Sequence, residues 1–191
     1  MDRTASRPRK ADAIFSATLE LLAERGYDAL TIEAVAARAG VHKTTIYRTW
    51  ATKDEVLADA LVQAPELTFA MPDTGSLRGD LLELAKQIYR LLSDPANRRV
   101  ITTVVSALPD RPATAEAAGR FFADRLGREQ AVFDRAHDRG ELAEAADAEM
   151  IMDLLGGNLW FHTLIRAKSA DDAYLERLVD TVLTGIPRGG R

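Results

Sequence analysis

The residues best suited to bind a polyanion are concentrated in one short stretch, from Ala39 to Trp50. It contains two cations, Lys43 and Arg48, with several hydroxyl side chains between them. Arginine and lysine donate to guanine or to phosphate oxygens, and threonine can contact a thymine methyl group. The stretch is therefore a candidate nucleic-acid surface. Together with flanking residues, the candidate contacts are Thr31, His42, Lys43, Thr44, Thr45, Tyr47, Arg48 and Lys53.

The distribution of charge supports this interpretation, although the chain of 191 residues has a formal net charge of −4. No Asp or Glu occurs between Arg38 and Lys53, so the acidic excess lies elsewhere. The charge of the local surface matters more to a nucleic acid than the charge of the whole protein. We therefore expect a basic surface from Arg38 to Lys53.

Two short helices are expected to position these side chains. Thr31 is a favourable N-cap for a helix over 32–38, and Gly40 can end that helix because glycine adopts the left-handed conformation without steric cost. In the helix that follows, Ile46 and Trp50 lie four residues apart on one face, which leaves the polar side chains on the other. This pattern predicts a helix-turn-helix.

At these residues the chain resembles the tetracycline-repressor (TetR) family of transcriptional regulators. The resemblance implies that Thr31, Tyr47 and Lys53 meet the sugar-phosphate backbone, while the second helix, with Lys43, Thr44, Thr45 and Arg48, reads base edges. One departure is His42, which stands where members often carry a helix-capping Ser; a histidine caps poorly. The matching residues are Gly26–Ile32, Val35, Ala36, Ala39–Val41, Lys43, Ile46, Tyr47, Trp50 and Lys53.

Apolar residues at helical spacing predict helices in the rest of the chain, without any sustained β alternation. Thr52 with Glu55, and Ser169 with Asp172, have the spacing of capping boxes. The expected helices cover 11–25, 53–63, 77–92, 95–108, 112–137, 148–165 and 169–183. We predict an all-α protein with a flexible basic arm at 1–10, a helix-turn-helix DNA-binding domain with a linking fourth helix at 11–63, and a C-terminal helical ligand-binding and dimerisation domain at 76–191.

The helix from Met150 to Ile165 is apolar nearly all round, which predicts burial by its own chain on one side and by a second chain on the other. Close helix approach would explain Gly156 and Gly157 in mid-helix. The alternative is a central core helix without a partner. The resemblance favours the homodimer, since TetR regulators typically dimerise through their last two long helices. Candidate interface residues are Ile151, Leu154, Leu155, Leu175, Leu178 and Val182.

Polar and aromatic residues scattered among the C-terminal helices could line a cavity for a small, largely apolar molecule. Each of them could equally be a surface residue or a satisfied core residue. The candidates are Tyr89, Arg98, His137, Asn158, Trp160 and His162.

Catalytic and metal-binding functions find little support. The chain has no cysteine, and its three histidines have no second ligand at metal-binding spacing. Neither a phosphate-binding glycine loop nor a nucleophile elbow is present. No stretch is apolar over the length of a membrane span, and the N-terminus does not resemble a secretion signal. We expect a cytoplasmic protein that is not an enzyme and needs no metal or cofactor.

Taken together, these features predict a homodimeric, sequence-specific regulator that binds a palindromic operator in double-stranded DNA. We expect a repressor that a small-molecule effector releases from its operator. The alternatives are a helical small-molecule-binding protein without DNA function, and an enzyme that uses the C-terminal cavity. The basic surface from Arg38 to Lys53 favours DNA binding, because a purely ligand-binding protein would have no need of it.

Overall fold

The computed structural model describes residues 10–63, 67–143 and 146–185, and the regular elements in these ranges are all helices. The predicted all-α fold is therefore confirmed. Apart from Lys10, the predicted flexible arm lies outside the described residues. The chain forms two compact units, one of residues 1–68 and 95–122 and the other of residues 69–94 and 123–191.

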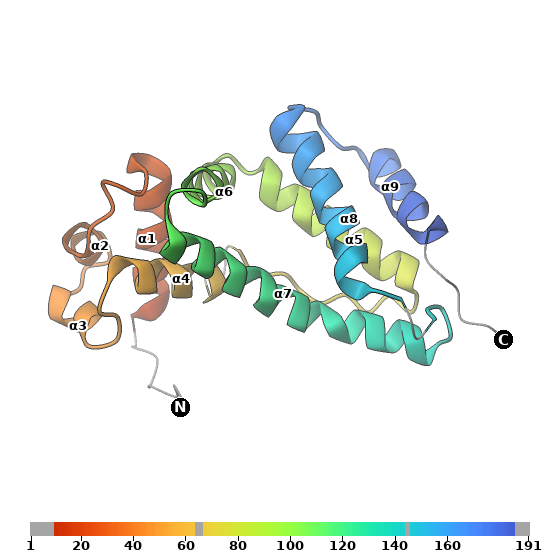
Figure 1. Ribbon diagram of the computed structural model, residues 1–191, viewed down its shortest axis with the longest axis horizontal. Coiled ribbons are helices and arrows are strands. Elements are labelled where there is room, and N and C mark those ends of the chain that lie inside the picture. Colours follow the sequence, from red (N-terminus) through yellow and green to blue (C-terminus); the bar gives the residue numbers. More distant parts are fainter. Residues whose placement is uncertain (1–9, 64–66, 144–145, 186–191) are drawn as a thin grey trace. The chain divides into compact units, whose positions relative to one another are not determined.

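In the first unit, α1 is the central helix, and α2, α4 and α6 pack against it (Figure 1). Its buried residues include Phe15, whose ring meets Trp50 edge to face with 5.6 Å between the centroids. The helices of this unit are α1 (Ala11–Arg25), α2 (Ile32–Arg38), α3 (Lys43–Tyr47), α4 (Lys53–Gln63), α6 (Pro95–Ala107) and the first part of α7 (Pro112–Asp138).

This unit is larger than the predicted helix-turn-helix domain at 11–63. Helix α6 packs on α1, with Val100 and Val104 buried. Because those two residues lie one turn apart on α6, the helix has one apolar face, and that face is covered by residues more than seventy positions earlier in the chain. Sequence spacing alone could not show which helix would cover it.

In the second unit, α5 packs against α8 and α9 (Figure 1). Leu81, Leu84, Leu155, Leu159 and Val179 are fully buried there and form its aliphatic core. The helices of this unit are α5 (Leu77–Ser93), the later part of α7, α8 (Ala148–Trp160), the π-helix η2 (Phe161–Ile165) and α9 (Asp172–Thr184).

Helix α9 begins later than its predicted capping box. Asp171 is its N-cap and accepts a hydrogen bond from the Tyr174 amide at 2.8 Å, so the prediction that Ser169 caps the helix is wrong. The carbonyl of Ser169 instead lies 3.1 Å from His162 Nε2. The capping box before α4 has its main bond, from the Glu55 amide to Thr52 Oγ1 at 3.2 Å, while the Glu55 carboxylate accepts from the Ala51 amide rather than from Thr52.

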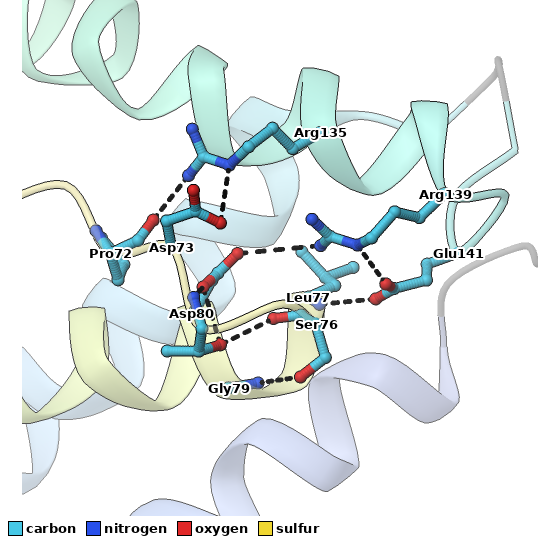
Figure 2. A network of polar contacts seen from close by, with 10 residues as sticks. Pro72, Asp73, Ser76, Leu77, Gly79, Asp80, Arg135, Arg139 and Glu141 are labelled. Carbon is cyan, nitrogen blue, oxygen red and sulfur yellow. Dashed lines mark hydrogen bonds and ion pairs between the residues drawn. The ribbon is translucent and has the colours of Figure 1, made fainter.

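A polar network in the second unit holds the segment before α5 against the end of α7 (Figure 2). Asp80 is fully buried and accepts hydrogen bonds from the amide and the hydroxyl of Thr74, at 2.7 and 2.8 Å. A Cβ atom at Gly79, in the first turn of α5, would lie 2.2 Å from Thr74 Oγ1, so this position requires glycine. Arg139 bridges Asp80 and Glu141, and Glu141 accepts from the first amide of α5.

Candidate nucleic-acid interface

The turn between α2 and α3 has the predicted geometry. Thr31 Oγ1 accepts a hydrogen bond from the Ala34 amide at 3.2 Å and so caps α2. Gly40 has a φ angle of +64°, in the left-handed region, and the Val41 amide then donates to the Ala36 carbonyl at 3.0 Å. The chain therefore reverses tightly enough for α3 to begin at Lys43.

Helix α3 is anchored on one side only. Ile46 is fully buried, and Trp50 is buried with its Nε1 donating to Asp59 at 2.7 Å. Trp50 lies beyond the end of α3, but its amide still donates to the Ile46 carbonyl at 3.0 Å, which keeps the two side chains on one face. His42 precedes the helix and makes no side-chain capping bond, as expected for histidine.

The opposite face of α3 presents those candidate DNA-contacting residues that lie between His42 and Arg48. Thr45 is half-buried there, while the others are exposed, and Thr31 is exposed at the start of α2. The Thr31 hydroxyl accepts the capping bond, and its proton remains available to a phosphate oxygen. The exposed residues of this surface are His42, which precedes α3, and then Lys43, Thr44, Tyr47 and Arg48.

Arg38 does not add its full charge to this surface. Its guanidinium lies 2.9 Å from Glu20 and 2.8 Å from Glu24, both on α1. The same contact lowers the pKa of Glu24, mainly through the hydrogen bond from Arg38. The stretch from Arg38 to Lys53 is free of acids in sequence, but this pairing across two helices neutralises its first cation.

Lys53 has a structural role that the sequence did not reveal. Its ammonium donates to the carbonyls of Tyr27 and Leu30, both at 3.0 Å, and lies 4.2 Å from the centre of the Tyr27 ring. The Arg111 guanidinium lies 4.4 Å from that ring and pairs with Asp28. Lys53 thus ties α4 to the turn between α1 and α2.

The Tyr27 hydroxyl completes this cluster by donating to Asp54. Burial and that hydrogen bond raise the pKa of Tyr27 to about 12, so the phenol stays protonated in the physiological range. Tyr27 therefore supports the turn that leads into α2.

Replacing Lys53 by methionine is expected to lower stability as well as DNA affinity. The substitution keeps most of the apolar stem but removes two charge-assisted hydrogen bonds, so the free energy of unfolding should fall by about 1–3 kcal/mol. If the third ammonium proton also meets a phosphate, the slope of log affinity against log salt should decrease in magnitude by about one. Thermal melting and DNA titrations at several salt concentrations measure the two effects.

Lys43 provides the matched control, because it is exposed on α3 and its closest acid, Glu33, is 3.9 Å away. Lys43→Met should leave the melting temperature unchanged and, because Lys43 is expected to contact base edges, should change the salt slope little. An unchanged melting temperature for Lys53→Met would show that its two carbonyl contacts contribute no stability.

The predicted dimer residues of the second unit are mostly inside it. Leu154 is 51% exposed on α8, whereas its neighbour Leu155 is 0% exposed. Buried side chains have no surface to offer a second chain, so of the predicted set only Leu154 can contribute substantially. The predicted interface residues that are buried in the chain's own core are Ile151, Leu155, Leu175, Leu178 and Val182.

The predicted effector residues belong to several helices of both units. Arg98 is exposed on α6 in the first unit, and His137 is exposed near the end of α7. Tyr89 and Trp160 are half-buried on α5 and at the end of α8. That these residues line one cavity stays a prediction.

Asn158 and His162 instead join α8 and η2 to α9. Asn158 Oδ1 accepts from the Tyr174 hydroxyl at 2.6 Å, and the His162 ring stacks on Tyr174 with 4.0 Å between centroids. With the Ser169 carbonyl beside Nε2, His162 has partners for both its ring face and one nitrogen. These contacts account for both residues as satisfied structural groups.

A buried ion pair on α7 was not predicted from the sequence. Glu129 is 2% exposed, and its Oε1 lies 3.6 Å from Arg125 Nε one turn earlier. The guanidinium of Arg125 stacks on the Phe69 ring at 3.3 Å from the ring centre. The sequence contained a signal of this burial. Glu129 lies three residues after Leu126 and four before Phe133, which places it on the apolar stripe of α7.

Burial opposes the charge of both members of this pair. It raises the pKa of Glu129 to about 7, against the lowering effect of Arg125. It also lowers the pKa of Arg125 to about 10, against the raising effect of Glu129. Arg125 therefore compensates the carboxylate only in part.

Among the residues that the structure describes, no group of three potential metal ligands occurs. Within the same ranges, none of the helices has both the length and the apolar character to cross a membrane.

The two anchored helices and the exposed polar face of α3 define a helix-turn-helix DNA-binding protein. Two family models match the chain: "Bacterial regulatory proteins, tetR family" over residues 14–60, and "Tetracyclin repressor-like, C-terminal domain" over residues 71–182. The chain belongs to the TetR family of transcriptional regulators, which confirms the resemblance found in the sequence.

Relatives extend the similarity over nearly the whole chain. The helix-turn-helix transcriptional regulator YdeS of Bacillus subtilis is 31% identical, over 97% of this chain and 96% of its own length. The DNA-binding transcriptional repressor TetR of Mycobacteroides abscessus is 33% identical, over 95% of both chains. The crystal structure of the TetR-family regulator SCO0332 is 30% identical, has a TM-score of 0.74, and is matched over 92% of this chain and 97% of that one. The relatives named here are transcriptional regulators.

Proposed function

We propose that this regulator is a homodimeric repressor that binds a palindromic operator and releases it when a small-molecule effector binds. The observation that carries the DNA-binding part is the one-sided anchoring of α3: Ile46 and Trp50 are buried, while Lys43, Thr44 and Arg48 are exposed. In this arrangement α3 enters the major groove, and its side chains reach base edges.

The backbone of the DNA would be held from both sides of α3. Thr31 offers a hydroxyl proton at the start of α2, Tyr47 is 48% exposed at the end of α3, and Lys53 keeps one ammonium proton beyond its two carbonyl bonds. Residues 11–63 form the DNA-binding domain in this proposal, and residues 76–191 form the domain for effector binding and dimerisation.

The dimer would be formed by the exposed side of α8. Gly156 and Gly157 lie on this helix, and a Cβ atom built on either meets no atom of the chain within 4 Å, which leaves room for a second helix. Large apolar side chains exposed on one helix face are unusual unless a partner covers them. We call these exposed residues, the first two on α8 and the last two on η2, the α8 stripe: Met150, Leu154, Phe161 and Ile165.

Dimerisation would place two α3 helices on successive turns of the major groove, about 34–36 Å apart. An effector that prefers a dimer geometry with a different spacing would then lower operator affinity, and operator binding would lower effector affinity by the same factor. A protein with this role acts where the chromosome is, in the cytoplasm.

Selection of bound fragments from random DNA tests the proposal. We expect the full-length protein to enrich an inverted repeat whose half-sites are centred about 10 base pairs, or a multiple of that, apart. Enrichment of no sequence, with tight binding of small molecules, would favour the alternative of a ligand-binding protein without DNA function.

A further inference from the structure

The Arg125–Glu129 pair is a poor structural ion pair. The closest approach of the two side chains, 3.6 Å between Nε and Oε1, is too long for a hydrogen bond. Glu129 Oε1 is fully buried and accepts no hydrogen bond from the described residues. Burying a carboxylate without hydrogen bonds is costly, and an apolar pair of the same volume would avoid that cost.

Apart from Arg125, the residues around Glu129 on α7 are largely apolar. Phe69 covers the Arg125 guanidinium, and Val132 and Phe133, three and four residues after Glu129 on α7, are buried. Among the described residues, Arg125 is the charged group that acts on Glu129. Because Arg125 Nε lies 3.6 Å from Oε1 and does not hydrogen-bond to it, another donor would be needed to satisfy Oε1.

We propose that Glu129 is the polar anchor of the effector site and that the effector is a largely apolar molecule with a protonated amine. The ammonium group donates to Glu129 Oε1 and adds a positive charge beside a carboxylate that Arg125 compensates only in part. An alcohol or amide could donate a hydrogen bond but would add no positive charge to that of Arg125. This inference rests on the proposed function, because it assigns a ligand to the effector domain.

The test uses the full-length dimer and three amines with different apolar bodies: octylamine, 1-adamantylamine and 1-naphthylmethylamine. Each is compared with the alcohol that has the same body, by calorimetry and thermal shift. We expect at least one amine to bind about tenfold or more tightly than its alcohol, and Glu129→Gln to abolish that preference. Asp124→Asn is the matched control, because Asp124 forms an exposed ion pair with Arg128 at the same spacing on α7; it should keep the preference.

The pH dependence has a defined sign. Burial raises the pKa of Glu129 to about 7, so the carboxylate gains its charge between pH 6 and 8, while an alkylamine stays protonated. Amine binding should therefore be about tenfold tighter at pH 8 than at pH 6, and alcohol binding should not strengthen over this range. If no amine is preferred over its alcohol, or if the preference persists in Glu129→Gln, the inference is wrong.

A measurement on the wild-type protein covers the case in which Glu129→Gln does not fold. The carboxyl carbon of Glu129, observed by NMR, should titrate near pH 7 in the free protein and at lower pH with the amine bound. Titration near 4.5 in the free protein would overturn the inference. Neither result depends on DNA, so failure here would leave the repressor proposal standing, and failure to select an operator would leave the amine site testable.

Discussion

Leu154→Arg is expected to give a folded monomer that no longer binds its operator tightly, whereas Leu155→Arg is expected to give a protein that does not fold. The two leucines are neighbours on α8, but Leu154 is 51% exposed and Leu155 is 0% exposed. A charge at position 154 reaches water in the single chain and would be buried unpaired only in a dimer. A charge at position 155 would be buried unpaired within the chain itself.

The magnitudes follow from that difference. An unpaired charge in an interface or core costs about 3–5 kcal/mol, which weakens dimerisation at least about a hundredfold in one case and removes much of a typical domain's stability in the other. Light scattering at micromolar concentration measures the mass, and circular dichroism measures the helical content.

Val105→Arg is the control, since Val105 is another exposed apolar side chain, on α6, and its replacement should change neither mass nor fold. If Leu154→Arg remains a dimer, the α8 stripe is not the interface. The same conclusion would follow if Val105→Arg also became monomeric.

This pair of variants shows what the sequence could and could not predict about the dimer. Apolar residues all round α8 indicated that both sides of the helix are covered, but the pattern did not say which side faces the chain's own core. Leu155 faces inward because it packs in the core that α8 forms with α5 and α9, helices that are distant in sequence. Which side of α8 faces the core depends on tertiary packing. Because of that packing, the proposed interface now includes Met150, Phe161 and Ile165.

Local features of the DNA-binding domain were predictable because short-range chemistry determines them. The Thr31 cap, the left-handed Gly40 and the Ile46 and Trp50 face all involve residues within four positions of one another. The charge of the surface was less predictable. Arg38 is neutralised by acids 14 and 18 residues earlier on α1, and Lys53 bonds to carbonyls 23 and 26 residues earlier.

The effector domain was the hardest part to predict from sequence. Histidine and asparagine among aliphatic residues suggested a cavity, yet His162 and Asn158 are satisfied by Tyr174 and its neighbours. Glu129 and Arg125, which were not predicted, have the same spacing as a solvent-exposed pair on a helix. Only the position of Glu129 within the apolar stripe of α7 distinguished it from the exposed pair of Asp124 and Arg128.

Substitutions on the exposed face of α3 should have the largest effect on operator recognition. Thr44→Ala and Arg48→Met each remove a side chain that can reach base edges, at a cost of about 1–3 kcal/mol per half-site. A dimer on a palindrome makes each contact twice, so the loss on the full operator should be roughly double. The effect on shuffled DNA should be small, since nonspecific binding depends on phosphate contacts.

The salt dependence of DNA binding shows whether Arg48 contacts base edges or the phosphate backbone. A base-contacting arginine can be removed with little change in the slope of log affinity against log salt, whereas loss of a phosphate contact reduces its magnitude by about one. Arg98→Met, at an exposed arginine on α6, controls for the change in net charge, and unchanged melting temperatures establish that α3 is still anchored by Ile46 and Trp50. If both α3 variants keep the preference for operator over shuffled DNA while binding stays tight, α3 does not read the sequence. The exposed polar face of α3 would then hold the phosphate backbone, and specificity would have to come from another part of the chain.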